Sequence, residues 1–107
     1  MSQDTVKIHR GLVGVYFDRT KTTYINGKEG ILEYCGYNIH DLAENSTFEE
    51  TAYLLLNGSL PNQSELDQFN TDLINSRSIP PKIIDIIRSI KDAHPMDVLR
   101  TSVSALS

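Results

Sequence analysis

The sequence has few of the residues that build the common small-protein sites. Its 107 residues include one cysteine, Cys35, and no tryptophan. A single cysteine excludes a disulfide framework or a CxxC metal site within the chain, and it favours a reducing, intracellular setting. The chain also lacks a P-loop, a GxGxxG loop, a GxSxG elbow and an HxxxH pair. These absences remove the usual sequence signals for nucleotide, hydrolase and zinc chemistry.

Positive charge is missing from a long central interval. No Lys or Arg lies between Lys28 and Arg77, whereas nine acidic residues do, and the whole chain has a net charge of −4. Such a surface repels phosphate, so we expect neither nucleic acid nor an anionic membrane as a partner. The interval is typical of a solvated acidic surface.

Long apolar runs are missing as well. No run approaches the roughly 20 residues that a membrane-spanning helix needs. The first ten residues, MSQDTVKIHR, are polar and lack the apolar core of a signal peptide. We therefore expect a cytoplasmic protein without a membrane span. The apolar fraction of 39% is ordinary for a globular chain, and the length suits one small domain.

The first third of the chain predicts an arm followed by a β-hairpin. Residues 1–11 are predicted to form a flexible arm. Apolar residues alternate over 13–17, which is a weak strand pattern. The β-branched and aromatic segments 22–25 and 31–34 flank Asn26-Gly27, a pair that suits a tight turn, although the connection can be longer than two residues.

After Gly36 the apolar period changes to that of helices, and about five are predicted. Capping residues or prolines mark their starts: Asn38, Ser46-Thr47, Asn62, Pro81 and Pro95. Asn57-Gly58 is expected to end the second helix, because glycine tolerates the left-handed conformation of a C-cap. The predicted fold class is mainly α, with a short N-terminal β-hairpin followed by about five helices.

Apolar stripes run along these predicted helices. They comprise Phe48, Ala52, Leu55 and Leu56 on the second helix, Leu66, Phe69, Leu73 and Ile74 on the third, and Met96, Leu99, Val103 and Leu106 on the fifth. Isoleucines cover most of the fourth helix, which is therefore expected to be substantially buried: Ile83, Ile84, Ile86, Ile87 and Ile90.

The histidines show no sign of a metal or catalytic cluster. His9 lies in the arm and His40 lies beside Asp41, and neither has a partner at metal-ligand spacing. His94 precedes Pro95 and is expected to cap the fifth helix. We therefore assign no metal ligand and no catalytic histidine in this chain.

Cys35 and the paired acids also have structural explanations. No nearby cation would favour the thiolate of Cys35, so we interpret it as a buried or half-buried structural thiol. Glu49 and Glu50 lie in the predicted first turn of a helix, where acidic side chains complement the helix dipole. No catalytic or cofactor-binding residue is assigned.

Two longer stretches carry a family resemblance. They are Tyr34–Pro61, YCGYNIHDLAENSTFEETAYLLLNGSLP, and Asp92–Ser107, DAHPMDVLRTSVSALS, and the hairpin TYINGKEGILEYCGY leads into the first. In this order and spacing they resemble the citrate synthase family over about residues 11–107. The resemblance implies that residues 1–107 are the N-terminal part of the large helical domain of a citrate synthase-like fold.

That resemblance implies an enzyme that condenses an acyl-CoA with oxaloacetate. The acyl-CoA is acetyl-CoA in citrate synthase and propionyl-CoA in 2-methylcitrate synthase, and the sequence fits both. In the family a carboxylate removes a proton from the α-carbon of the thioester, and histidines act on the thioester carbonyl and on the ketone of oxaloacetate. Arginines bind the carboxylates of oxaloacetate. The family enzyme is a homodimer whose active site lies between a large and a small domain. Those catalytic motifs lie downstream of the part covered here. The resemblance thus implies acyl-CoA and oxaloacetate as partners of the full-length enzyme, no separate cofactor, and an inactive chain by itself.

Many family members have an Arg at the position of Cys35, which in some relatives contacts CoA phosphate, so that contact cannot be transferred to this chain. Arg100 lies in the predicted fifth helix and is assigned a structural role. The apolar pattern reaches Ser107 without a stop signal, which predicts a helix running to the end and a longer native polypeptide. The alternative hypothesis is a free-standing helical module for protein interaction.

Overall fold

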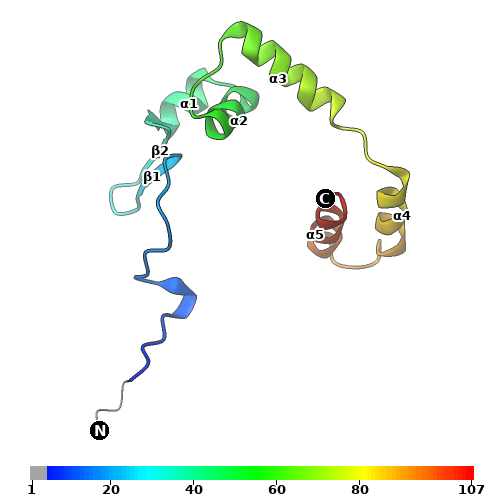
Figure 1. Cartoon of the computed structure of the whole chain (residues 1–107), viewed down its shortest axis with the longest axis horizontal. Coiled ribbons are helices and arrows are strands. Elements are labelled where there is room, and N and C mark those ends of the chain that lie inside the picture. Colours follow the sequence, from blue (N-terminus) through cyan, green and yellow to red (C-terminus); the bar gives the residue numbers. More distant parts are fainter. Residues whose placement is uncertain (1–4) are drawn as a thin grey trace. The chain divides into compact units, whose positions relative to one another are not determined.

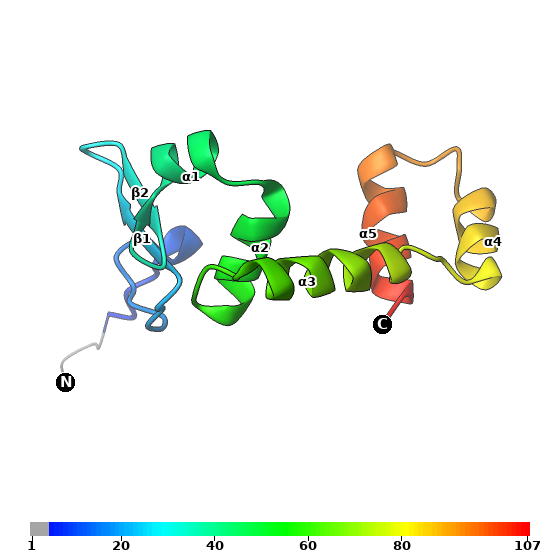
Figure 2. The ribbon, with the colours of Figure 1, turned by 90° about the horizontal axis from the view of Figure 1, so that it is seen from above.

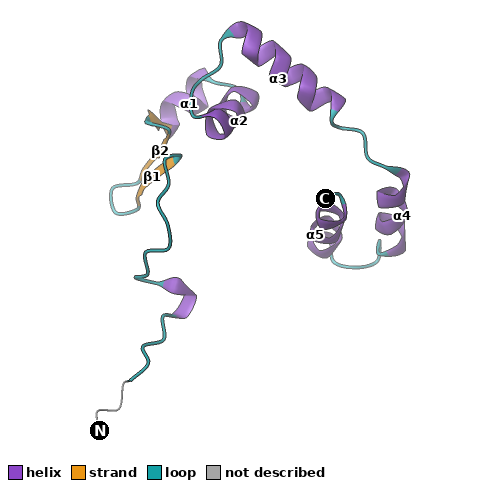
Figure 3. Cartoon of the chain, in the orientation of Figure 1, coloured by secondary structure: helices purple, strands orange, loops and turns teal. Residues whose placement is uncertain are grey.

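Helices and a small sheet make up the part of the chain that the structure, a computed structural model, describes, residues 5–107. This part contains five α-helices and a three-stranded sheet (Figures 1 and 3). The chain divides into two compact units, of which one ends at Asn62 and the other is Gln63–Ser107. The predicted mainly-α class is confirmed.

The sheet of the first unit is antiparallel, in the order β1-β2-β3. Its strands are β1 (Thr23–Asn26), β2 (Ile31–Tyr34) and β3 (Tyr37–Asn38). The Asn26 side-chain oxygen accepts bonds from the N–H groups of Lys28 (3.2 Å) and Glu29 (3.3 Å) and so holds the longer β1–β2 connection. The predicted hairpin is confirmed, and the two-residue strand β3 is an addition that the sequence did not indicate.

The segment before the sheet contains no strand. Arg10–Leu12 form a short 3-10 turn, and residues 15–20 have no regular secondary structure. The predicted strand over 13–17 was therefore wrong for this chain, because no strand edge pairs with it among the described residues. Residues 1–4 of the predicted arm lie outside the described residues, and the flexibility of the arm stays a prediction.

Helices α1 (Ile39–Asn45) and α2 (Phe48–Asn57) begin and end where their capping residues indicate. The Asn38 side chain accepts a bond from the N–H of His40 (2.9 Å) and caps α1. Thr47 Oγ1 accepts from the N–H of Glu50 (3.3 Å), which confirms the predicted N-cap, and the Thr47 hydroxyl donates to the Glu50 carboxylate (3.2 Å). Gly58, at φ 82°, ends α2, as predicted.

The core of the first unit differs from the predicted apolar stripe of α2. Leu54 is fully buried and Leu42 nearly so, whereas Phe48 and Leu56 of the stripe are 78% and 75% exposed. The β2–β3 turn reaches α2 through the bond from the Cys35 thiol to the Leu54 carbonyl oxygen. Ala52 and Leu55 of the stripe are half-buried, so the periodicity located an apolar face that is covered only in part within the described unit.

The second unit contains α3 (Gln63–Asn75), α4 (Pro81–Ser89) and α5 (Pro95–Ala105). Helices α4 and α5 lie side by side, joined by the predicted turn at 92–94 (Figure 2). Pro81 and Pro95 occupy the first helical positions, as predicted, because proline has no N–H to leave unpaired there. Helix α3 begins directly after Asn62, its expected capping residue.

Burial in the second unit is less extensive than predicted. Ile83 is 1% exposed, but Ile84 is exposed and the other isoleucines of α4 are half-buried, since α5 covers one side of α4. Met96, Leu99, Val103 and Leu106 are each between 51% and 62% exposed. Helix α5 ends at Ala105, so the expectation that it runs through Ser107 was wrong. None of the helices described is long and apolar enough to cross a membrane.

Candidate functional site

The turn between β2 and β3 is the most tightly defined feature of the first unit. Tyr34 pairs with Tyr37, so only Cys35 and Gly36 lie in the loop. Both have positive φ, 48° and 86°, as a two-residue hairpin turn of type I′ requires. Glycine adopts this conformation freely, whereas a residue with a Cβ pays about 1 kcal/mol or more for it. The conformation at Cys35 must therefore be held by its surroundings.

Two hydrogen bonds provide that support. The Cys35 N–H donates to the Thr22 carbonyl oxygen (2.8 Å), and the thiol donates to the Leu54 carbonyl oxygen at 3.6 Å. The same Leu54 oxygen accepts the N–H of Gly58 (2.8 Å), the bond that closes α2. The half-buried thiol of Cys35 thus connects the turn to the last turn of α2, which is a structural arrangement.

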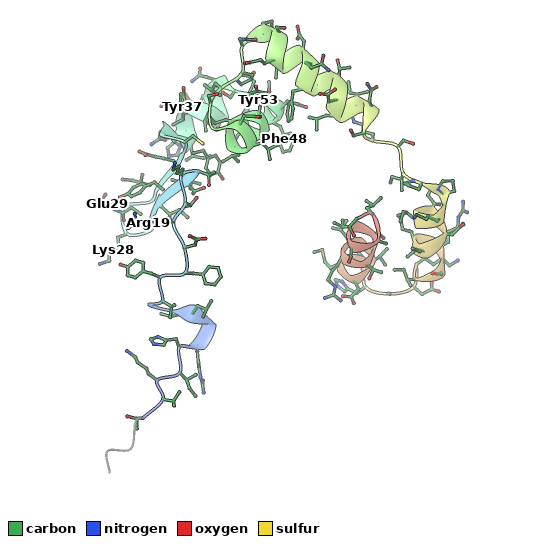
Figure 4. The ribbon with its side chains drawn as sticks, viewed as in Figure 1. Arg19, Lys28, Glu29, Tyr37, Phe48 and Tyr53 are labelled. Atoms are coloured by element: carbon green, nitrogen blue, oxygen red, sulfur yellow. The ribbon has the colours of Figure 1, made fainter. Side chains whose placement is uncertain are left out.

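An open apolar hollow lies on the surface of α1 and α2, around the connection between them. Its volume is about 250 Å³, and residues from 39 to 51 line it, among them Leu42, Ala43, Phe48 and Thr51. Phe48 and Tyr37 are labelled in Figure 4, and both are exposed. The lining contains no ionisable side chain, so the hollow suits an apolar side chain of another segment and offers nothing for proton transfer or anion binding.

The three histidines lie in separate segments: before the sheet, in α1 and at the N-cap of α5. His94 Nδ1 accepts the N–H of Met96 (3.1 Å) and caps α5, as predicted. His9 Nδ1 lies 3.2 Å from the Val13 carbonyl oxygen, and His40 is exposed in the first turn of α1. Among residues 5–107 no three His, Cys, Asp or Glu side chains come together in a group that could hold a metal ion.

The charged residues singled out in the sequence make local, exposed contacts. Arg100 pairs with Asp97 one helical turn away, at 3.1 Å. Such an exposed pair contributes little to stability and leaves the guanidinium accessible to solvent. Glu49 and Glu50 lie in the first turn of α2, where the Glu50 N–H donates to the N-cap.

Sequence reasoning missed two features that organise this region. One is the type I′ turn. Its signal was the pair Cys35-Gly36 standing directly between Tyr34 and Tyr37. The other is Leu54, which the apolar stripe of α2 omitted. Neither feature supplies a reactive group. Within the described part, the chain offers a scaffold and an apolar hollow.

Comparisons with known proteins agree with the resemblance noted in the sequence. Residues 11–107 match the family model described as citrate synthase, C-terminal domain. A citrate synthase of Deinococcus radiodurans is 48% identical over 92% of this chain. A 2-methylcitrate synthase of Corynebacterium glutamicum is 42% identical over 96% of it.

Solved structures give the same result. The citrate synthase of Pyrobaculum aerophilum matches 99% of this chain with a TM-score of 0.90 and 37% identity. That of Thermoplasma acidophilum, solved with carboxymethyl coenzyme A and oxaloacetate, matches 79% with a TM-score of 0.74 and 37% identity. This chain spans 26% of the Deinococcus protein, 27% of the Corynebacterium protein and 26% of the Pyrobaculum chain. With most of its length matched by the family model, the chain belongs to the citrate synthase family.

Proposed function

We propose that this chain is the N-terminal part of the large domain of an enzyme that condenses an acyl-CoA with oxaloacetate. The observation that carries the proposal is the family match over residues 11–107. The chain spans about a quarter of the length of the relatives it matches. The acyl group is acetyl or propionyl, since both kinds of synthase are among the relatives. The whole enzyme is proposed to be a cytoplasmic homodimer, in the tricarboxylic acid cycle if the acyl group is acetyl.

The proposed reaction joins two carbon atoms and then splits a thioester. The α-carbon of the acyl-CoA loses a proton and bonds to the ketone carbon of oxaloacetate, whose oxygen gains a proton. Water then cleaves the thioester, releasing CoA and citrate or 2-methylcitrate. An acid–base group, hydrogen-bond donors for the developing enolate and cations for the carboxylates are needed. We assign none of these to residues 1–107, so the chain is proposed to be inactive by itself.

The exposed surface supports a role as part of a larger body. Apolar side chains are exposed at Phe48 and Leu56 on α2 and at Met96, Leu99 and Val103 along α5. The proposed remainder of the large domain would cover them.

The experiment that tests this proposal begins with the protein in its natural source. We expect an intact mass several times 12.0 kDa, the mass of this chain. The full-length enzyme should release CoA thiol from acetyl-CoA or propionyl-CoA in the presence of oxaloacetate, and the 107-residue chain should not. A natural mass of 12.0 kDa with cooperative unfolding would instead support the free-standing interaction module.

Cys35 offers a separate test of CoA binding. The resemblance places an Arg at this position in many members, and we propose that its absence lowers the affinity of the enzyme for acyl-CoA. In the full-length enzyme Cys35→Arg is then expected to lower the KM for acyl-CoA several-fold, because a guanidinium pairs with phosphate. Cys35→Gln is the control of similar length without charge. An equal KM in both variants would contradict the proposal.

A further inference from the structure

The chain contains two Asn-Gly pairs, and the structure gives them different surroundings. Asn26-Gly27 ends β1 and opens its connection to β2, whereas Asn57-Gly58 ends α2. An asparagine before glycine is the one whose side-chain amide the next main-chain nitrogen attacks most readily, because glycine has no side chain to obstruct the approach. Both pairs reach solvent, so exposure does not distinguish them. The difference lies in how each side chain and each following N–H is held.

The Asn26 side chain is folded over the peptide that follows it. Its Oδ1 accepts bonds from the N–H groups of Lys28 (3.2 Å) and Glu29 (3.3 Å), two residues labelled in Figure 4. The ring of atoms that the first of these bonds closes includes Asn26 Cγ and the Gly27 nitrogen. The two atoms that would react are therefore held near each other. Within residues 5–107 the Gly27 N–H has no acceptor, so no hydrogen bond opposes loss of its proton.

The same hydrogen bonds favour attack on the Asn26 amide. Two N–H groups directed at Oδ1 stabilise the negative charge that develops on this oxygen as Cγ is attacked. Nδ2 donates to the Glu29 carboxylate (3.0 Å), which accepts only, so the partners fix which end of the amide is the nitrogen. The leaving nitrogen thus lies apart from the donors that hold the oxygen, and the amide is oriented for the reaction.

Asn57 has the opposite arrangement. The Gly58 N–H donates to the Leu54 carbonyl oxygen (2.8 Å) and closes α2, so it is engaged where the Gly27 N–H is free. Asn57 Nδ2 donates to the Tyr53 carbonyl oxygen (3.1 Å), one helical turn earlier. Side chains of a helix point toward its N-terminus, and this bond holds the Asn57 amide away from Gly58. Its reaction first requires that both bonds break.

We propose that Asn26 is a site of spontaneous deamidation, that the fold protects Asn57, and that the change at Asn26 loosens the β1–β2 connection. The Gly27 nitrogen loses its proton to hydroxide and bonds to Asn26 Cγ. The Cγ–Nδ2 bond then breaks, and the nitrogen takes up a proton and leaves as ammonia. Water opens the resulting succinimide at either carbonyl and gives aspartate or isoaspartate. One water is consumed and nothing is oxidised or reduced. The inference does not depend on the proposed enzymatic activity.

The product changes both the charge and the length of the chain at this point. A new carboxylate replaces the amide that donates to Glu29, so two like charges face each other in a segment that is already acidic. Isoaspartate also adds a carbon atom to the main chain at Asn26, whose pairing with Ile31 belongs to the register of β1 and β2. Both changes weaken the connection.

Incubation of the folded 107-residue chain in mildly alkaline buffer tests the selectivity. Trypsin places the two asparagines in different peptides, 22–28 and 29–77, and fragment masses locate each conversion. Relative to the same chain unfolded in urea, Asn26 should react at a similar rate. Asn57 should be slowed by about tenfold or more, because two hydrogen bonds have to break first. If folding slowed Asn26 as much as Asn57, the proposal would be overturned.

Two glycine variants separate the chemistry from the fold. Gly27→Ala adds a Cβ in open space on a backbone that is not left-handed, so the hairpin is kept while attack on Asn26 becomes slower. Gly58→Ala changes the other pair and should leave the rate at Asn26 unchanged. Hydrogen exchange should become faster in β1 and β2 of the incubated chain, but not of incubated Gly27→Ala. An unchanged rate at Asn26 in Gly27→Ala would overturn the proposed reaction, and unchanged exchange in the converted chain would overturn the loosening.

Discussion

The thiol of Cys35 and the carbonyl oxygen of Leu54 lie 3.6 Å apart, so a residue in a strained turn is bonded to the only fully buried residue of the first unit that the structure describes. Cys35→Val is expected to destabilise the unit by about 1–2 kcal/mol, because a β-branched residue at φ 48° adds strain and loses the bond. Cys35→Asn, which tolerates this conformation, should be milder. Urea unfolding followed by circular dichroism measures both, and equal midpoints would contradict the strain.

Leu54 and Leu56 form a matched pair, two residues apart on the same helix. Leu54→Ala should destabilise this chain by about 2–5 kcal/mol, because it leaves a cavity in the core. Leu56→Ala should have an effect of less than about 0.5 kcal/mol, because the side chain is 75% exposed. In the proposed full-length enzyme the second value is expected to rise, since more of the domain covers α2. Thermal unfolding of both proteins provides the comparison, and an unchanged Leu56 value would argue against such covering.

Alanine substitutions at Gly58 and Gly27 separate the effect of a left-handed backbone on stability from the effect of steric contact. A Cβ added at either position would have no other atom within 4 Å. Of the two glycines, only Gly58 has a left-handed backbone, with φ 82°. Gly58→Ala is therefore expected to lower stability by about 1 kcal/mol, whereas Gly27→Ala should have little effect. Chemical denaturation distinguishes them. Equal losses would show that the C-cap conformation of Gly58 contributes nothing.

Thr47 tests the N-cap of α2. Thr47→Ala removes the acceptor for the Glu50 N–H and should destabilise the helix by about 1 kcal/mol, and Thr47→Ser, which keeps the hydroxyl, should not. The loss should appear as faster amide exchange in the first turn of α2. If Thr47→Ser exchanged as fast as Thr47→Ala, the hydroxyl would not be the cause.

His94 is the corresponding test in the second unit. His94→Ala removes the acceptor of the Met96 N–H and should destabilise α5 by about 1 kcal/mol. His94→Asn restores an acceptor at that position and should recover most of the loss. Helix content from circular dichroism and the unfolding midpoint provide the readout, and a neutral His94→Ala would contradict the capping role.

The sequence predicted the parts of the fold that depend on neighbouring residues. Caps at Asn38, Thr47 and His94 and the stop at Gly58 were all confirmed, because each acts within one helical turn. Burial was predicted less well. The periodicity shows which residues share a face, but it does not show whether another segment covers that face, as Phe48 and the isoleucines of α4 illustrate.

The turn at Cys35 shows a second limit. A type I′ turn is usually signalled by Asn-Gly or Gly-Gly, so Cys-Gly was not recognised as one. The candidate site was predicted to contain no catalytic residue, and that remains a prediction, because the catalytic residues of the proposed enzyme would lie outside these 107 positions.

Asn38 belongs to two elements at once, since it is the last residue of β3 and the N-cap of α1. No linker separates strand from helix there, so displacement of Asn38 removes the end of β3 and the cap of α1 together. The sheet and α1 should consequently open as a single cooperative unit in native-state hydrogen exchange, with one common opening free energy for the amides of β2 and α1.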